Sequence, residues 1–209
     1  MVGSCNNYRP SGDRLLLLAT TNQNKFFEIR TALGQLGIPL CSLKDFPQID
    51  EAPETGSTFA ENAAQKANYY WEKFQKPVMA EDSGLVIPSL DGFPGIHSAR
   101  IGSDDNSRIG IVLDKLKNPD LDRKAYYICN IMLIVNNNNY AVEGRCDGSI
   151  LQVPDGTQGF GYDPIFLPDG ALHPFGRMSI KEKSQYSHRA QAVHKIIPYL
   201  ISEFRKIPA

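Results

Sequence analysis

The sequence predicts an α/β fold built on a mixed β-sheet, and three features lead to this expectation. A strand candidate, Leu15 to Thr20, runs through a short polar turn into a helical pattern. Strand and helix patterns then alternate along the chain, as in a sheet covered by helices. Residues 125–135 and 140–146 are rich in β-formers and indicate a hairpin, so the sheet is not purely parallel.

Two amphipathic helices are expected in the first third of the chain. The first has apolar residues at helical spacing from Phe26 to Leu36, and Gly37 is expected to end it. The second opens at Thr58, where Thr58-x-x-Glu61 has the pattern of a capping box. Its apolar face comprises Ala63, Ala67, Tyr70 and Phe74.

The middle of the chain predicts short strands separated by turns. Residues 77–80 form a strand that enters an acidic turn at 81–84, and 85–87 resume as a strand. Asp91-Gly92 and Pro94-Gly95 are turn signals, and 109–116 indicate a helix closed by Asn118-Pro119.

The last third begins with the hairpin, whose Asn136–Asn139 run we expect to supply positive φ angles rather than a binding site. The Gly-rich stretch 156–161 precedes a short strand at 164–167. A final helix starts near Ser187, and Pro198 should kink or split it.

Composition limits the function classes. We expect residues 1–13 to form a loose tail and 14–209 to form a single domain. The net charge of −1 argues against nucleic acid as the main ligand. The four cysteines show neither CxxC nor zinc-finger spacing, which favours free thiols. No apolar run is long enough to span a membrane, so the expected location is the cytoplasm.

The turn from Thr20 to Lys25 is the first candidate binding site. A strand that enters a helix through hydroxyl and amide residues brings backbone N–H groups and a lysine together, which suits a phosphate. The alternative is an N-capped helix with a solvated lysine. No Walker A or GxGxxG pattern is present.

Acidic residues give a second candidate site. Glu81 and Asp82 are adjacent and follow an apolar strand, where a divalent cation held by carboxylates and substrate phosphates would offset their repulsion. The alternative is an acidic surface turn. Asn62 and Lys66 lie four apart on the second helix and alone indicate a solvent face, but Glu54 shortly precedes that helix.

The C-terminal candidates are Phe160 to Asp163, Lys183 and the run from Ser187 to Arg189. An aromatic ring between glycines offers a face for a base, and Lys and Arg donate to phosphate or keto oxygens. Each alone has a structural alternative, a packed turn for the first and a helix-start histidine at His188.

Six short segments follow one another along residues 20–192: TTNQNK, ETG with TFAENAAQKA, AEDSGL, PGIHSAR, GFGYDPIF and KSQYSHRAQA. Together the segments closely resemble the inosine/xanthosine triphosphate pyrophosphatase family, which hydrolyses ITP, dITP and XTP. The resemblance covers more than four-fifths of the chain. It implies a long mixed sheet with flanking helices in two lobes around a central nucleotide-binding cleft, and a homodimer.

The resemblance also implies roles for individual residues. Glu54 and Asp82 would bind Mg²⁺, and Asp82 would also activate the attacking water. The expected substrate-binding residues are Thr20, Thr21, Asn22, Gln23, Asn24, Lys25, Lys66, Ser83, Phe160, Gly161, Tyr162, Asp163, Lys183, His188 and Arg189. Among these, Phe160 would stack on the base, whereas the donors near His188 and Arg189 would meet a 6-keto oxygen.

Two residues depart from the family pattern, since Thr21 replaces a common Gly and Glu81 a common Asp. We interpret both replacements as changes that tune the site without loss of its function. Three other functions are less consistent with the sequence. A Maf-type pyrophosphatase is disfavoured by FGYD and SHR, a non-catalytic nucleotide sensor by the presence of Glu54 and Asp82, and a nucleic-acid binder by the lack of a basic stripe.

Overall fold

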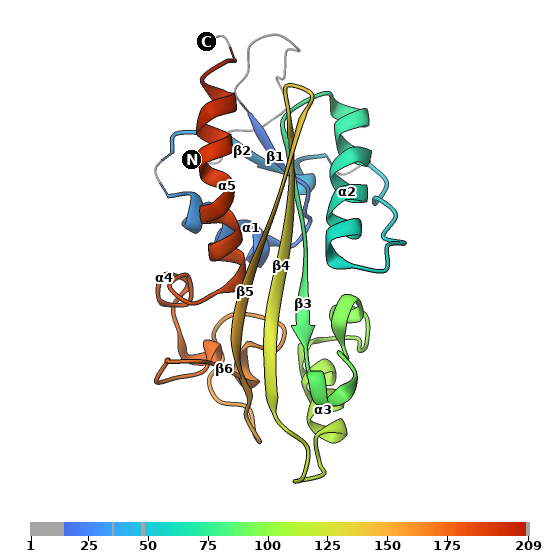
Figure 1. The fold of residues 1–209 in the computed structure, drawn as a ribbon, viewed down its shortest axis with the longest axis vertical. Coiled ribbons are helices and arrows are strands. Elements are labelled where there is room, and N and C mark those ends of the chain that lie inside the picture. Colours follow the sequence, from blue (N-terminus) through green and yellow to red (C-terminus); the bar gives the residue numbers. More distant parts are fainter. Residues whose placement is uncertain (1–14, 35, 47–48, 208–209) are drawn as a thin grey trace. The chain divides into compact units, whose positions relative to one another are not determined.

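The computed structural model describes residues 15–34, 36–46 and 49–207, so the predicted tail at 1–13 lies outside the described residues. It has a six-stranded sheet in the order β2-β1-β3-β4-β5-β6. Strand β1 (Leu16–Leu18) pairs parallel with β2 (Leu40–Ser42) and β3 (Val78–Val86), whereas β5 (Asn138–Ile150) pairs antiparallel with β6 (Phe166–Pro168). The expected mixed sheet with flanking helices is confirmed (Figure 1).

The chain divides into two compact units. Unit 1 comprises residues 1–82, 130–142 and 193–209, and unit 2 comprises 83–129 and 143–192. The boundary falls inside three strands, β3, β4 (Lys124–Val135) and β5, and inside helix α5 (His188–Phe204).

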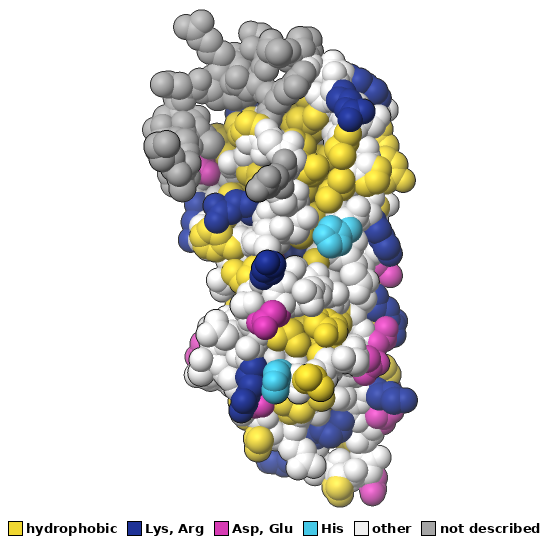
Figure 2. All heavy atoms as spheres, turned by 90° about the vertical axis from the view of Figure 1, so that its left-hand side faces the viewer, with side chains coloured by type: hydrophobic (Ala, Val, Ile, Leu, Met, Phe, Trp, Pro, Cys, Tyr) yellow, Lys and Arg dark blue, Asp and Glu magenta, His cyan; other side chains and the backbone are white. Residues whose placement is uncertain are grey.

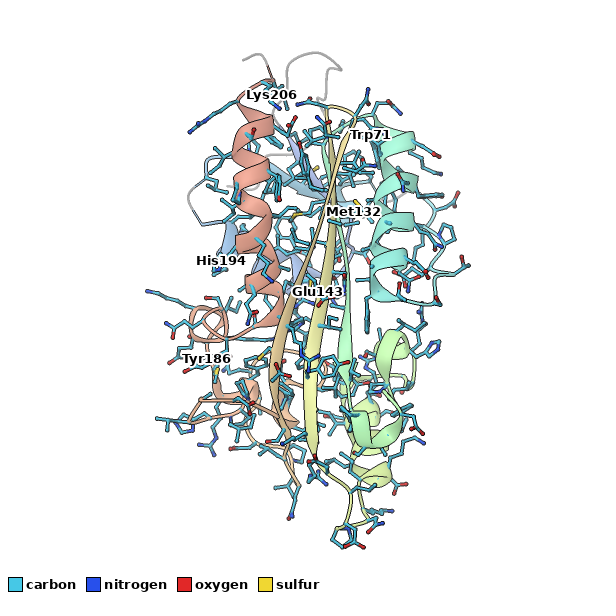
Figure 3. All side chains as sticks on the ribbon, in the orientation of Figure 1. Trp71, Met132, Glu143, Tyr186, His194 and Lys206 are labelled. Atoms are coloured by element: carbon cyan, nitrogen blue, oxygen red, sulfur yellow. The ribbon has the colours of Figure 1, made fainter. Side chains whose placement is uncertain are left out.

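Unit 1 packs helices against parallel strands. Helix α1 (Gln23–Leu33) follows β1, and helix α2 (Phe59–Phe74) precedes β3. Its core contains Leu17, Cys41, Ala67, Tyr70, Val78 and Ile134, among others. Trp71 of α2 and Met132 of β4 pack against this core (Figure 3).

Unit 2 has its own core under helix α3 (Asp105–Lys115). Ile109, Val112 and Leu116 pack there with aromatic side chains, and Tyr127 meets Phe166 edge-on with ring centroids 4.8 Å apart. The short helix α4 (Ile180–Lys183) follows β6. Because each unit buries an apolar cluster of its own, each can hold functional side chains rigidly.

The hairpin and the last turn of α5 meet at a buried carboxylate. Asn136 and Asn137 have φ angles of 50° and 61°, which confirms the prediction for the Asn run. Glu203, whose side chain is 1 % exposed, accepts hydrogen bonds from Asn136 (2.9 Å) and Tyr140 (2.8 Å), and Lys206 pairs with it at 2.5 Å. Figure 3 shows Lys206 at the C-terminal end of α5.

Three predictions about the elements need correction. Helix α1 ends at Leu33 rather than near Gly37, because Gly34 (φ 61°) is its C-cap. Glu61 does not complete the capping box, since its carboxylate accepts from Ser57, although Thr58 caps α2 as expected. Pro198 does not split α5, which is a single helix, and the other expected outcome, a kink, stays a prediction.

The fourth correction concerns the acidic segment. Residues 81–84 do not form a turn, because β3 runs without a break from Val78 to Val86. Glu81 and Asp82 are therefore buried strand residues, with 4 % and 8 % of their surfaces exposed. Burial of two adjacent acids requires cationic or hydrogen-bonding partners.

Candidate active site

The first group of predicted residues lies in unit 1 around the acidic pair of β3. Lys25 Nζ lies 2.5 Å from Glu81 Oε1, and Lys66 Nζ pairs with the Glu54 carboxylate and donates to the Glu81 carbonyl oxygen at 3.2 Å. Two predicted residues, Lys25 and Lys66, thus contact Glu81 of the acidic pair, and Glu54 joins this group through Lys66. The ammonium groups neutralise carboxylates that would otherwise repel one another.

Asp82 is held by an amide that the sequence pattern placed on a solvent face. Asn62 is fully buried, and its Nδ2 donates to Asp82 Oδ2 at 3.1 Å, so that expectation was wrong. Its Oδ1 accepts from the Gly56 amide at 2.8 Å. Both hydrogen-bonding ends of the side chain are therefore used, and the amide fixes the direction of one Asp82 oxygen.

Electrostatics differ between the two key side chains of this group. Burial raises the pKa of Asp82, and the nearby Glu81 raises it further, although Lys66, Lys25 and Asn62 act in the opposite direction. Burial alone would lower the pKa of Lys66, but the charges of Glu54, Glu81 and Asp82 outweigh it and the pKa is raised. Lys66 therefore carries its charge at neutral pH.

The turn before α1 is already capped by its own chain. Asn22 Oδ1 accepts from the amides of Asn24 (2.9 Å) and Lys25 (3.2 Å), and Thr20 Oγ1 accepts from the Asn22 amide. The capped-helix alternative thus describes the local geometry, except that Lys25 is paired rather than solvated. Thr21 lies in the same turn, and Gln23 is the first residue of α1. Thr21 is exposed and is not among the described residues with positive φ. The common Gly is therefore not required there by backbone strain.

The second group lies in unit 2 around the Phe160 ring. Lys183 Nζ and the Arg189 guanidinium lie 4.9 and 5.7 Å from the ring centroid, within cation–π range. Lys183 also pairs with Asp163 at 2.6 Å, and Asp163 accepts from the Phe160 amide at 2.9 Å. Arg189 donates from Nη2 to Ser83 Oγ at 2.8 Å. Five predicted residues are thus connected in one network.

The remaining predicted residues of unit 2 have structural contacts. Tyr162 is buried and donates from its hydroxyl to the Ser98 carbonyl oxygen at 2.7 Å. The His188 ring stacks on Tyr127 with centroids 4.6 Å apart and planes 6° apart. Gly161 donates from its amide to Asp105. Their predicted contacts with the nucleotide remain predictions.

Arg189 and Lys183 are buried, at 2 % and 3 % exposure, whereas Phe160 is half-buried. A buried, charge-bearing donor held in place by a neighbouring hydroxyl is suited to reading a polar edge. A half-buried ring is suited to stacking on a flat apolar face. The unit 2 group therefore combines a fixed cationic donor with a partly exposed aromatic face.

Among the residues that the structure describes, no cluster of three or more His, Cys, Asp or Glu side chains forms a ready metal site. Lys25 pairs with Glu81, and Lys66 pairs with Glu54. Cys41, Cys129 and Cys146 are buried and are not linked in disulfides, whereas Cys5 lies outside the described residues. No helix in the described ranges is long and apolar enough to span a bilayer.

Comparison with known proteins identifies the family. The family model of the Ham1 family matches residues 16–199. This chain belongs to the Ham1 family. Ham1-family relatives include the dITP/XTP pyrophosphatase of Halalkalibacterium halodurans, 42 % identical over 88 % of this chain and 97 % of the relative. The dITP/XTP pyrophosphatase of Christiangramia forsetii is likewise 42 % identical, over 88 % of this chain and 98 % of that protein.

Solved Ham1 structures share the fold. A HAM1 protein from Coxiella burnetii matches with a TM-score of 0.80 at 34 % identity and covers 90 % of this chain and 98 % of that one. The Ham1 protein of Staphylococcus aureus matches with a TM-score of 0.79 at 32 % identity, over 90 % and 99 % of the two chains. The resemblance read from the six motifs is thus confirmed at the level of family and fold.

Sequence reasoning missed two residues of these networks. Asn62 was assigned to solvent because helical periodicity places it on the polar face of α2. Asp105 was not considered, although it opens α3 and binds the Gly161 amide. No pattern along the chain signals either role, because each contact joins residues 20 or more positions apart.

Proposed function

We propose that this Ham1-family chain is a nucleoside triphosphate pyrophosphatase that hydrolyses dITP, XTP and ITP to the monophosphate and pyrophosphate. Such a reaction removes deaminated purine nucleotides from the nucleotide pool. The observation that carries the proposal is the buried Asp82 carboxylate, oriented by Asn62 and surrounded by Lys25 and Lys66. The names of the relatives support dITP and XTP as substrates, and the motif resemblance supports ITP.

The proposed reaction is attack of water on the α-phosphorus. The water oxygen forms a bond to phosphorus, the bond from the α-phosphorus to the α–β bridging oxygen breaks, and pyrophosphate leaves. Asp82 positions the water and accepts its proton. Because Asn62 donates to Oδ2, the other carboxylate oxygen, Oδ1, is the one we assign to the water.

The lysines of unit 1 stabilise negative charge. Lys25 and Lys66 are the cations of this group, and Lys66 stays protonated because three carboxylates surround it. A triphosphate offers further anionic oxygens to the same ammonium groups. Their charge stabilises the leaving pyrophosphate more strongly as negative charge develops on it.

The donor set of unit 1 fits Mg²⁺. Glu54 and Asp82 supply hard carboxylate oxygens, and Mg²⁺ in nucleotide enzymes is commonly held by one or two carboxylates together with substrate phosphates. The lack of a three-ligand cluster in the described residues is compatible with that mode. When bound, Mg²⁺ neutralises phosphate charge and lowers the pKa of a bound water.

Unit 2 supplies groups suited to the base. Arg189, fixed by Ser83, donates hydrogen bonds, which a 6-keto oxygen accepts and a 6-amino group does not. Phe160 offers its ring for stacking, which acts on all purines alike. We therefore assign selection of the base edge to Arg189 and general affinity to Phe160.

Surface charge and assembly complete the proposal. On the face shown in Figure 2, Lys and Arg side chains are scattered, several beside acidic ones, which suits a small substrate better than a polyanion. We also propose a cytoplasmic homodimer, which rests on the motif resemblance and, for the location, on a cysteine spacing typical of a reducing compartment. Light scattering on purified protein measures the assembly.

One assay tests the activity. Pyrophosphate release is measured with dITP, XTP, ITP, GTP and ATP, with Mg²⁺ and with excess chelator, and Asp82→Asn serves as the blank. We expect turnover of the three deaminated substrates that exceeds that of GTP and ATP and is lost in chelator. Equal turnover of ATP would overturn the substrate assignment, and full activity in chelator would overturn the metal.

A further inference from the structure

Residues 160–163 form a turn, the Phe160 turn, which is joined to helix α3 by a hydrogen bond between residues 56 positions apart. The Gly161 amide donates to Asp105 Oδ2 at 2.7 Å. The other carboxylate oxygen, Oδ1, pairs with the Arg108 guanidinium one helical turn later. The Asp105 carboxylate is thus fixed by a cation on one oxygen and binds the turn through the other.

Arg108 connects the same network to the PGIHSAR segment, a motif to which we assigned no role. Its Nη1 donates to the carbonyl oxygens of Ala99 and Gly102, both at 3.1 Å. A Cβ at Gly102 would lie 2.7 Å from Ser107 Oγ, so this loop packs closely on the first turn of α3. Tyr162 adds a second tie through the Ser98 carbonyl oxygen.

The turn is therefore held at two successive amides. Asp163 accepts from the Phe160 amide at 2.9 Å and Asp105 from the Gly161 amide. Gly161 has φ 64°, and no atom lies within 4 Å of a Cβ built there. Glycine in open space has wide conformational freedom, so an external hydrogen bond is what fixes this residue.

We infer that Asp105 is a positioning residue, which holds the Phe160 ring in the orientation that stacks on the purine base. The inference rests on the proposed function. Asp105 acts through Gly161 rather than on the substrate, and Arg108 keeps its carboxylate in place. The PGIHSAR segment and α3 then serve as the support for the base-binding turn.

The decisive experiment is a double-mutant cycle on KM for dITP. Asp105→Ala should raise KM by about three- to tenfold, a fraction of what base stacking is worth, and change kcat by less than about twofold. In the Phe160→Ala background the same substitution should change KM no further, because the ring through which it acts is gone. Asp105→Asn, which keeps an acceptor oxygen for Gly161, should recover most of the affinity.

The matched control is Asp104→Ala. Asp104 caps the same helix by accepting from the Ser107 amide at 2.8 Å, whereas the Gly161 amide donates to Asp105. It should lower stability and leave KM unchanged. If Asp105→Ala fails to fold, Arg108→Lys carries the same expectation, a raised KM that disappears in the Phe160→Ala background.

The outcomes separate this inference from the proposed function. A wild-type protein that does not hydrolyse dITP would overturn the proposed function and this role with it. An active wild type, with KM unchanged by Asp105→Ala or raised by the same factor in both backgrounds, would overturn only the role of Asp105.

Discussion

Asn62 and Asp82 are joined by a hydrogen bond of 3.1 Å between two buried side chains. The amide cannot rotate without loss, because its oxygen already accepts from Gly56, where an added Cβ would lie 2.8 Å from that oxygen. One side chain, that of Asn62, therefore fixes the position of the segment that carries Glu54 relative to the strand that carries Asp82. This relationship gives the first prediction.

Asn62→Ala should lower kcat by about 10- to 100-fold, the usual effect of losing a partner that orients a metal or catalytic carboxylate. The KM for dITP should change less, because Asn62 binds Asp82 and Gly56. Asn68→Ala is the matched control, since Asn68 lies on the same helix and its amide donates to the Ala64 carbonyl oxygen within that helix. Equal losses in the two variants would contradict an orienting role.

Asp82→Asn should retain the fold and lose about 10²- to 10⁴-fold in kcat, the range for removal of a general base. The substitution deletes a charge at nearly constant volume. Circular dichroism checks the fold and pyrophosphate release measures turnover. Activity at the wild-type rate would exclude Asp82 as the base and make Glu81 the next candidate.

Phe160→Ala and Arg189→Ala should act on different quantities. Loss of stacking should raise KM for ITP and GTP by similar factors, about five- to a hundredfold. Loss of the Arg189 donors should instead narrow the preference for ITP over ATP. The measurement is kcat/KM for ITP, GTP and ATP with both variants, which distinguishes loss of stacking from loss of base-edge recognition. If Phe160→Ala alters the ITP-to-ATP ratio and Arg189→Ala does not, the two roles are assigned wrongly.

Glu203→Gln should lower the melting temperature at pH 7 and lose this effect in acid. Hydrogen bonds from Lys206, Asn136 and Tyr140 lower the pKa of Glu203 to about 2. Because the pKa of Glu203 is lower in the folded than in the unfolded chain, where it is about 4.3, its carboxylate stabilises the fold fully above that pH. This stabilisation is lost as the pH falls toward 2. Thermal melts of wild type and variant from pH 7 to pH 2.5 should therefore converge. Glu72→Gln, the same change at an exposed site of α2, controls for net charge.

Periodicity and turn chemistry predicted the mixed sheet, both early helices and the hairpin, because those signals are local. The acidic segment of β3 was misplaced because two adjacent carboxylates resemble a turn in sequence. They occupy a buried strand only because Lys25, Asn62 and Lys66 arrive from elsewhere in the chain. The motif resemblance identified most of the network residues, but Asn62 and Asp105 act through contacts that periodicity cannot reveal.

The discontinuity of unit 1 has a consequence for biosynthesis. Its third chain stretch begins only at Val193, and the Glu203 carboxylate accepts a hydrogen bond from Asn136 of the hairpin, 67 residues earlier. Because synthesis proceeds from the N-terminus, strands β1 to β3 are made long before α5. Unit 1 therefore cannot complete its folding until α5 has been synthesised. Nascent chains stalled before residue 193 should consequently remain protease-sensitive and dependent on chaperones.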